Sequence, residues 1–110
     1  MIKTEKKNEF IVITIEGSIL QNESNLLKKK LEKLLEDNEK NIVIDMSETN
    51  HVCSSALGHL VYYRNKIKRE SGDIRLVIVD DDLLELFDIT MLNQVFMIFP
   101  NQIKALESFA

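Results

Sequence analysis

The chain contains few of the residues that build covalent cross-links, metal sites or catalytic loops. Its 110 residues include one cysteine, one proline, three glycines, two histidines and no tryptophan. One cysteine excludes an internal disulfide, and together with two histidines it gives no credible set of metal ligands. So few glycines also leave no glycine-rich loop that would cradle a phosphate. These absences disfavour most classes of enzyme, and we expect no cofactor.

Positive charge and long apolar runs are also scarce. The formal net charge of −4 disfavours non-specific binding to nucleic acid or to an anionic membrane, because both need a basic surface. No segment has the uninterrupted apolar length of a membrane span, and the charged N-terminus lacks the apolar region of a signal peptide. We therefore expect a protein of the reducing cytoplasm, with neither a nucleic-acid nor a membrane partner.

The residues that are present predict one α/β domain over residues 1–110. Hydrophobic residues make up 45% of the chain, which is enough for a single core. β-rich apolar runs predict strands at residues 2–9, 10–16, 42–44, 74–79 and 95–99. Helical spacing predicts helices at residues 22–37, 54–70 and 83–89, and a fourth from Pro100. The order β-β-α-β-α-β-α-β-α predicts a mixed, largely parallel sheet of about five strands with four helices, in which the first two strands form a hairpin.

Several local features follow from the same patterns. Asn22 or Ser24 is expected to cap the first helix, and Pro100 is expected to be the first residue of the last one. The lysine-rich face of the first helix is interpreted as solvated, because acids in the same helix offset its charge. Side chains expected to pack in the core include Met46, Met91, Met97, Ile103 and Leu106.

Residues 41–58 form the stretch that we expect to lie at the centre of the fold and to contain the functional site. A short β-branched run, Ile42 to Ile44, predicts a strand buried on both faces in the middle of the sheet. A polar turn then places Ser54 and Ser55 directly before a helical run, so one of the two hydroxyls is expected to cap that helix. The first amides of a helix lack partners and its dipole is positive there, so a phosphate on Ser54 would be stabilised.

The helix that follows has two predicted faces. Its apolar side is expected to be mostly buried and consists of Leu57, Leu60, Val61, Arg64 and Ile67. On the other side, four side chains at positions i, i+4, i+7 and i+11 line up as one exposed stripe. They are Ser55, His59, Tyr62 and Lys66. We expect this stripe to contact a partner protein.

Two motifs here resemble the signature of the STAS domain family, the anti-sigma factor antagonists. They are Ile42-Val-Ile-Asp-Met-Ser47 and Cys53-Ser-Ser-Ala-Leu-Gly58. Gly17, the acid-rich turn after Val79 and the closing Phe99-Pro100 also lie where that family would place them. The resemblance implies a bacterial, non-enzymatic binding module that regulates sigma-factor-dependent transcription. Its partner would be a kinase-type anti-sigma factor, which would phosphorylate Ser54 and thereby end the binding.

A rival interpretation is a docking or assembly module that is never phosphorylated. In phosphorylated members of the family, the residue before the serine is usually Asp, whereas here it is Cys53. Leu20 likewise replaces an acidic residue, and Ala56 replaces a glycine. Under this interpretation Ser54 is only a helix cap. Either module is expected to be a monomer or a weak dimer.

Other polar residues allow chemical alternatives that we weigh against simpler roles. Cys53 lies at a helix start and close to His51, so a nucleophilic thiol is conceivable, but a half-buried structural thiol that orders the loop is favoured. The Asp80–Asp82 turn could bind a metal ion, but helix capping and solvation are favoured. Asp45, at the end of the central strand, is expected to order the following loop as a hydrogen-bond acceptor.

Overall fold

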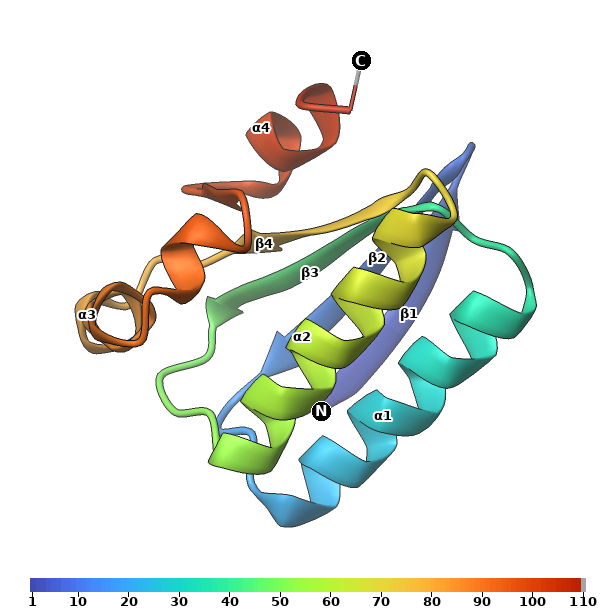
Figure 1. Ribbon diagram of the computed structural model, residues 1–110. Helices are drawn as coiled ribbons and strands as arrows, with labels where there is room; N and C mark the ends of the chain where they lie inside the picture. Colours follow the sequence, from blue (N-terminus) through green and yellow to red (C-terminus); the bar gives the residue numbers. More distant parts are fainter. Residues whose placement is uncertain (110) are drawn as a thin grey trace.

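A five-stranded mixed sheet forms the centre of the computed structural model, which describes residues 1–109 (Figure 1). The strands follow the spatial order β1-β2-β3-β4-β5. They are β1 (Ile2–Lys7), β2 (Phe10–Glu16), β3 (Asn41–Glu48), β4 (Asp73–Val77) and β5 (Ile98–Phe99). Only the β1–β2 hairpin is antiparallel, and each of the other neighbouring pairs is parallel. The predicted α/β class, the mixed sheet and the central position of β3 are confirmed.

Helices cover both faces of this sheet. Figure 1 shows α1 (Gln21–Glu36) and α2 (Ser54–Arg69) side by side on one face. The short α4 (Gln102–Glu107) packs on the other face against β3, β4 and β5. The helix α3 (Asp81–Ile89) and the 3₁₀ helix η1 (Leu92–Gln94) lie beyond the end of β4. The predicted element order is confirmed, with η1 as an addition.

The alternation of side chains along the strands divides the core into two parts. Ile11, Ile13 and Ile15 of β2 belong to the large cluster that α1 and α2 cover. Val43 and Val77 point to the opposite face and pack against α4. Both faces of β3 and β4 are covered, and the runs Ile42–Ile44 and Leu76–Val77 are accordingly apolar at successive positions. This rigid double-sided support holds the turn before α2 in place.

The C-terminal quarter differs most from prediction. The strand expected at residues 95–99 is reduced to Ile98–Phe99, because Met91 adopts a left-handed φ of 62° and the chain then enters η1. Pro100 does not begin the last helix. Asn101 is its N-cap, and the Asn101 side chain accepts a hydrogen bond from the Lys104 N–H at 2.9 Å. Ile103 is 69% exposed, so its predicted core position is wrong.

Two further local predictions are corrected. Neither Asn22 nor Ser24 caps α1: the helix begins after Leu20, whose N–H donates to the Glu23 carboxylate at 3.0 Å. Met46 is fully buried as expected, but the predicted core residues Met91 and Met97 are 58% and 48% exposed. None of the helices within residues 1–109 has the combined length and hydropathy that crossing a bilayer requires.

Candidate functional site

The loop that leads from β3 into α2 is tied to the neighbouring loop after β2. Ile19 and Val52 form an isolated parallel bridge, in which the Ile19 N–H donates to the His51 carbonyl at 2.8 Å and the Cys53 N–H donates to the Ile19 carbonyl at 2.9 Å. The Thr49 hydroxyl also donates to the Ile15 carbonyl at 3.1 Å. Ile19, Val52 and Thr49 are all buried. The loop is therefore well ordered up to the residue before Ser54.

Ser54 is exposed and is the first residue of α2. The N-cap is Cys53, and no side-chain hydrogen bond caps this helix in the part of the chain that the structure describes. The prediction that Ser54 or Ser55 caps α2 is therefore wrong: the helix begins at Ser54, as expected, so the cap position is occupied by Cys53. The first turn of α2 also contains no acidic residue. The Ala56 N–H donates to the Cys53 carbonyl at 3.1 Å, and no charged side chain of that turn faces the positive end of the helix dipole.

The Ser55 hydroxyl belongs to a small polar cluster between α1 and α2. It lies 2.8 Å from the Ser24 hydroxyl, 3.3 Å from the Cys53 sulfur and 3.4 Å from the Gln21 side-chain oxygen. Burial raises the pKa of the Cys53 thiol, but hydrogen bonds to the Ser55 hydroxyl and to the Ala56 and Ser55 N–H groups outweigh it, so the net pKa is lowered. A thiolate at this helix start would be stabilised.

The predicted exposed stripe on α2 is turned partly toward α1. Ser55, His59 and Lys66 are each only half-buried, whereas Tyr62 is 54% exposed. The centre of the solvent-facing side lies about one residue away around the helix. It consists of Ser54, Gly58, Tyr62, Asn65 and Arg69. We call these five residues the α2 face.

The buried side of α2 also differs from its prediction. Leu60 and Ile67 are fully buried as expected, but Leu57, Val61 and Arg64 are half-buried. The prediction missed two buried residues, Ala56 and Tyr63. The pattern of small and aromatic residues at helical spacing from Leu60 and Ile67 could have identified both.

A hollow of about 410 Å³ separates the two helices next to the α2 face. Lys28 and Glu32 of α1 and His59, Tyr62 and Tyr63 of α2 line it. Burial raises the pKa of Tyr63, and the nearby Glu32 carboxylate, which accepts a hydrogen bond from its hydroxyl at 3.4 Å, raises it further. Tyr63 therefore stays protonated, and only Tyr62 presents its ring to solvent.

Asp45 is the last residue of β3 that pairs with β4, and it connects β3 to α4. One carboxylate oxygen accepts from the Ser47 N–H and the other from the Gln102 side-chain amide of α4, each at 3.0 Å. Asp45 is 9% exposed. Its contacts bind the end of β3 to α4, which holds the strand that feeds the α2 turn.

The polar residues of the chemical alternatives have structural partners. The Cys53 sulfur contacts the Ser55 hydroxyl, and the fold does not pair it with His51, which is exposed. Asp80 caps α3 by accepting from the Leu83 N–H at 3.0 Å. Across residues 1–109, no group of three or more His, Cys, Asp or Glu residues is arranged to hold a metal ion.

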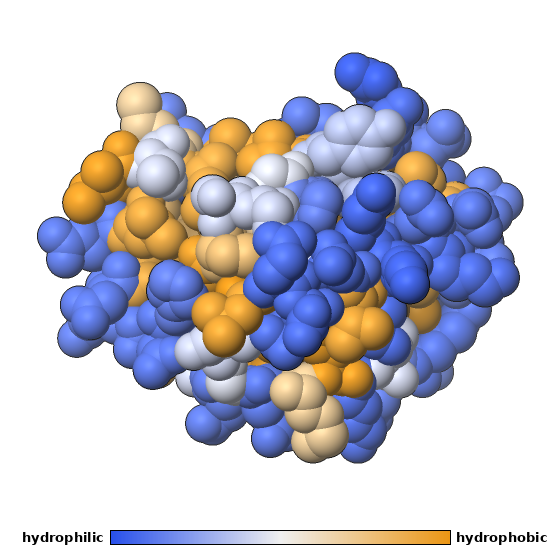
Figure 2. Space-filling model, turned by 90° about the horizontal axis from the view of Figure 1, so that it is seen from below, coloured by the Kyte–Doolittle hydropathy of each residue, from blue (hydrophilic) through white to orange (hydrophobic). Residues whose placement is uncertain are grey.

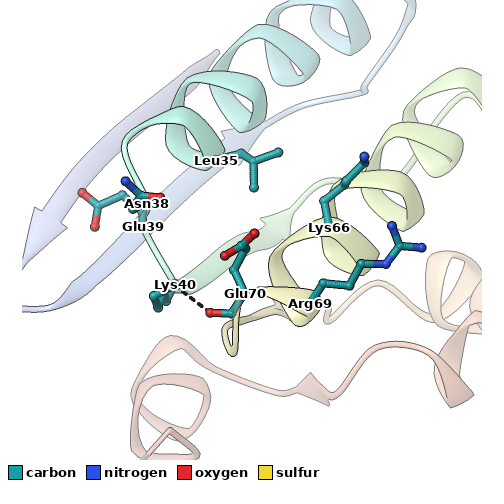
Figure 3. Close-up of a pocket in the computed structure, with 7 residues that line it drawn as sticks. All are labelled: Leu35, Asn38, Glu39, Lys40, Lys66, Arg69 and Glu70. Atoms are coloured by element: carbon teal, nitrogen blue, oxygen red, sulfur yellow. Dashed lines mark hydrogen bonds between the residues drawn. The ribbon is translucent and has the colours of Figure 1, made fainter.

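A second hollow lies at the opposite end of α2, near the amino end of β3. It has a volume of about 370 Å³, and Figure 3 shows its lining residues from the ends of α1 and α2 and from the connection between α1 and β3. The Lys40 ammonium donates to the Glu70 carbonyl at 2.6 Å across this hollow. Its mixed charges and its distance from Ser54, about 20 Å along the helix, separate it from the start of α2, although Arg69 of the α2 face also lines it.

These features define an α/β domain with an exposed serine at a helix start that lacks a side-chain cap within residues 1–109. A model of the STAS domain family matches residues 1–105, so the chain belongs to the STAS domain family. This confirms the resemblance seen in the sequence. No curated protein sequence gives a significant match.

Solved structures share the fold. An anti-sigma factor antagonist from Mycobacterium paratuberculosis is 21% identical, with a TM-score of 0.88 and coverage of 98% of this chain and 92% of that chain. SpoIIAA in its unphosphorylated form is 14% identical, with a TM-score of 0.85 and coverage of 99% and 96%. Phosphorylated SpoIIAA from Bacillus is 14% identical, with a TM-score of 0.79 and coverage of 100% of both chains.

Proposed function

We propose that this STAS domain is an anti-sigma factor antagonist of the bacterial cytoplasm. It binds a kinase-type anti-sigma factor through the α2 face, and phosphorylation of Ser54 ends the binding. The observation that carries this proposal is the exposed Ser54 at the start of α2. Among the four α-helices of residues 1–109, the starts of α1, α3 and α4 each have a side-chain oxygen that accepts from a backbone N–H, and the start of α2 has none. Family membership and the phosphorylated state of the similar SpoIIAA support it.

A phosphate on Ser54 would act locally. It adds close to two negative charges at neutral pH, next to N–H groups that have no acceptor within the helix. Those N–H groups and the helix dipole stabilise the phosphorylated form, so the fold itself does not resist the modification. A partner seated on the α2 face would instead have to accommodate a desolvated phosphate, which weakens binding.

The hydropathy of the surface around the helix starts agrees with a docking role. Figure 2 shows the end of the molecule at which α1 and α2 begin. Hydrophobic side chains gather over its left part, on the side where α3 lies in Figure 1, whereas its right part is mostly hydrophilic. Half-buried Leu57 and Val61 flank the α2 face and supply apolar contact area next to Ser54. An interface with an apolar centre and a polar rim suits this arrangement.

Gly58 gives a second, independent reason to regard the α2 face as a contact surface. It lies one turn after Ser54 inside a regular helix, where glycine costs about 1 kcal/mol relative to alanine. A Cβ at this position would meet nothing within 4 Å, so packing within the protein does not require glycine here. The absence of a side chain lets another molecule approach the helix backbone closely.

The phosphorylation test uses the cognate anti-sigma kinase and ATP, followed by intact-mass measurement. We expect the wild type to gain one phosphate and Ser54→Ala to gain none, while Ser55→Ala, the matched control on the adjacent serine, still gains it. In the same experiment, Ser54→Asp should bind the kinase at least about tenfold more weakly than Ser54→Ala. Equal binding of these two variants would refute the switch.

Gly58→Ala tests the contact surface without touching the serine. We expect it to raise the free energy of unfolding by about 0.5–1 kcal/mol, since alanine is the better helix former. The same variant should bind the anti-sigma factor more weakly in titration calorimetry. A gain in stability with unchanged binding would show that the partner does not seat on the α2 face.

The rival function is a docking or assembly module that uses the same α2 face without phosphorylation. Cys53 and Leu20, which replace the acidic residues usual in phosphorylated members, favour it. In that case Ser54 gains no phosphate from the cognate kinase, yet Gly58→Ala still weakens binding to the partner. The two experiments together therefore separate the switch from the plain docking module.

A further inference from the structure

The two edges of the sheet differ in their protection against pairing with another chain. The edge strand β1 carries Lys3, Glu5, Lys6 and Lys7, which are the kind of charges that discourage pairing. The other edge, β5, is protected only by its shortness and by Pro100, because residues 89–103 contain no charged residue. An uncharged edge strand is a template for the addition of a further strand.

The backbone of β5 has free groups on its outer side. The Met97 and Phe99 carbonyls accept hydrogen bonds from the Leu76 N–H at 3.0 Å and the Ile78 N–H at 3.2 Å, so they face β4. Backbone groups alternate sides along a strand, which directs the N–H and C=O of Ile98 away from the sheet. Pro100 lacks an N–H and limits the available edge to the residues before it.

A groove of about 560 Å³ runs along this edge. Residues 93–99 form one wall, and Arg64 and Lys68 of α2 form part of the other together with Asp73. The Met97 side chain, 48% exposed, lies in this groove. It is a half-apolar channel with cationic side chains on one side, which suits an extended peptide better than a compact ligand.

The charges of the groove do not balance. The buried Asp73 carboxylate is surrounded by three cations, with Arg75 at 3.1 Å, Arg64 at 3.5 Å and Lys68 at 4.0 Å. Arg75 is further engaged by the Ser108 carbonyl at 2.6 Å. The Arg64 Nε is buried and has no hydrogen-bond partner in the described chain, although it lies near Asp73. Three cations against one carboxylate leave a net positive charge, which the exposed Lys68 ammonium presents to an incoming acid, whereas the buried Arg64 Nε is not accessible to it.

We propose that this groove binds an extended acidic segment of a partner protein, which adds to the sheet as a strand beside β5. The segment pairs with the N–H and C=O of Ile98 and places a carboxylate against Lys68. A second copy of this chain fits less well, because its own uncharged edge contributes no carboxylate. Lys68 is about 20 Å along α2 from Ser54, so this surface is distinct from the start of the helix, although Lys68 is adjacent in sequence to Arg69 of the α2 face.

The test is an NMR titration of the ¹⁵N-labelled protein with a short Thr/Val peptide that has a central Glu pair, and with the same peptide carrying Gln instead. We expect amide shifts concentrated in residues 93–99, with the Glu peptide binding about tenfold more tightly than the Gln peptide. Lys68→Glu, at a side chain that is 54% exposed, should remove that preference without unfolding the protein.

A matched variant tests whether a charge on β5 prevents the pairing of another strand with this edge. Met97→Lys adds the kind of charge that β1 carries and should weaken the binding of both peptides, while Lys3→Met on β1 leaves it unchanged. Equal affinity for the Glu and Gln peptides, shifts located elsewhere, or no shifts at millimolar peptide would overturn the proposal. So would a dimer paired through β5 in sedimentation analysis.

Discussion

The starts of α2 and α3 are two versions of the same structural element with opposite electrostatics. At α3 the chain supplies its own anions: Asp80 caps the helix, and Asp81 and Asp82 occupy its first turn. At α2 the N-cap is Cys53, no side chain makes a cap hydrogen bond within residues 1–109, and the first turn has no acid. Both helices follow the end of a parallel strand in the same sheet.

The difference between the two helix starts has one consequence for the stability of the fold and another for the binding of an external anion. An internal carboxylate at α3 satisfies an N–H group and neutralises the helix dipole, so an external anion gains little there. At the start of α2 no acidic side chain opposes the helix dipole, and the exposed Ser54 hydroxyl lies beside it. If Ser54 is a switch, the start of α2 has no anion of its own and can therefore stabilise the phosphate that a kinase adds to Ser54.

The largest expected effect is the loss of the α3 cap. Asp80→Ala should lower the free energy of unfolding by about 1 kcal/mol, because the Leu83 N–H loses its acceptor. Asp80→Asn should recover most of that loss, since asparagine is an equally good cap. Ser54→Ala should change stability by less than about 0.5 kcal/mol. Urea denaturation measures all three variants, and a comparable loss in Ser54→Ala would erase the contrast between the two helix starts.

A smaller effect is expected when a charge is added to α2. Ser54→Asp should raise the free energy of unfolding by about 0.3–1 kcal/mol at low ionic strength, because the carboxylate faces the positive end of the helix dipole. The gain should shrink in high salt. Ser71→Asp, just beyond the other end of α2, is the control and should stabilise nothing. Destabilisation by Ser54→Asp would mean that the open start does not accept an anion.

The sequence predicts the architecture well because periodicity reflects burial directly. Apolar runs at β2 and β3 and the leucine spacing of α1 each report one buried surface, and all three elements are confirmed within a few residues. The capping role predicted for the Asp80–Asp82 turn is also confirmed, with Asp80 as the cap, although the helix begins at Asp81 and not at Leu83. At β5 the apolar run 95–99 misleads, since Phe96 is buried outside any strand, against Phe87.

The site is predicted less completely, because its details depend on neighbours that spacing does not reveal. The stripe through Ser55 and His59 has the correct helical period, but the position of α1 decides which edge of that stripe faces solvent. The prediction is therefore off by about one residue around the helix, and Ser54 rather than Ser55 belongs to the solvent-facing α2 face. The contact between Ser24 and Ser55 joins residues of two different helices, 31 positions apart in the sequence, so no local pattern predicts it.

The smallest expected effect concerns the thiol at the α2 start. The pKa of Cys53 is lowered in the folded protein, so alkylation by iodoacetamide should reach half its maximal rate at a lower pH than in the denatured chain. Because the folded-state pKa is the lower one, the thiolate contributes stability above the unfolded pKa, and this contribution is lost as pH falls through the folded pKa. Ser55→Ala should move the alkylation midpoint upward by removing a hydrogen bond to sulfur.

The comparison is sharpest with a thiol moved to α3. Asp82→Cys in a Cys53→Ala background places the only cysteine in a first turn beside Asp80 and Asp81, whose charges oppose ionisation. Its alkylation midpoint should lie above that of Cys53, even though both thiols are at helix starts. Equal midpoints would show that acids at α3 do not close that start to a second anion, and the open start of α2 would then have no special affinity for the phosphate proposed on Ser54.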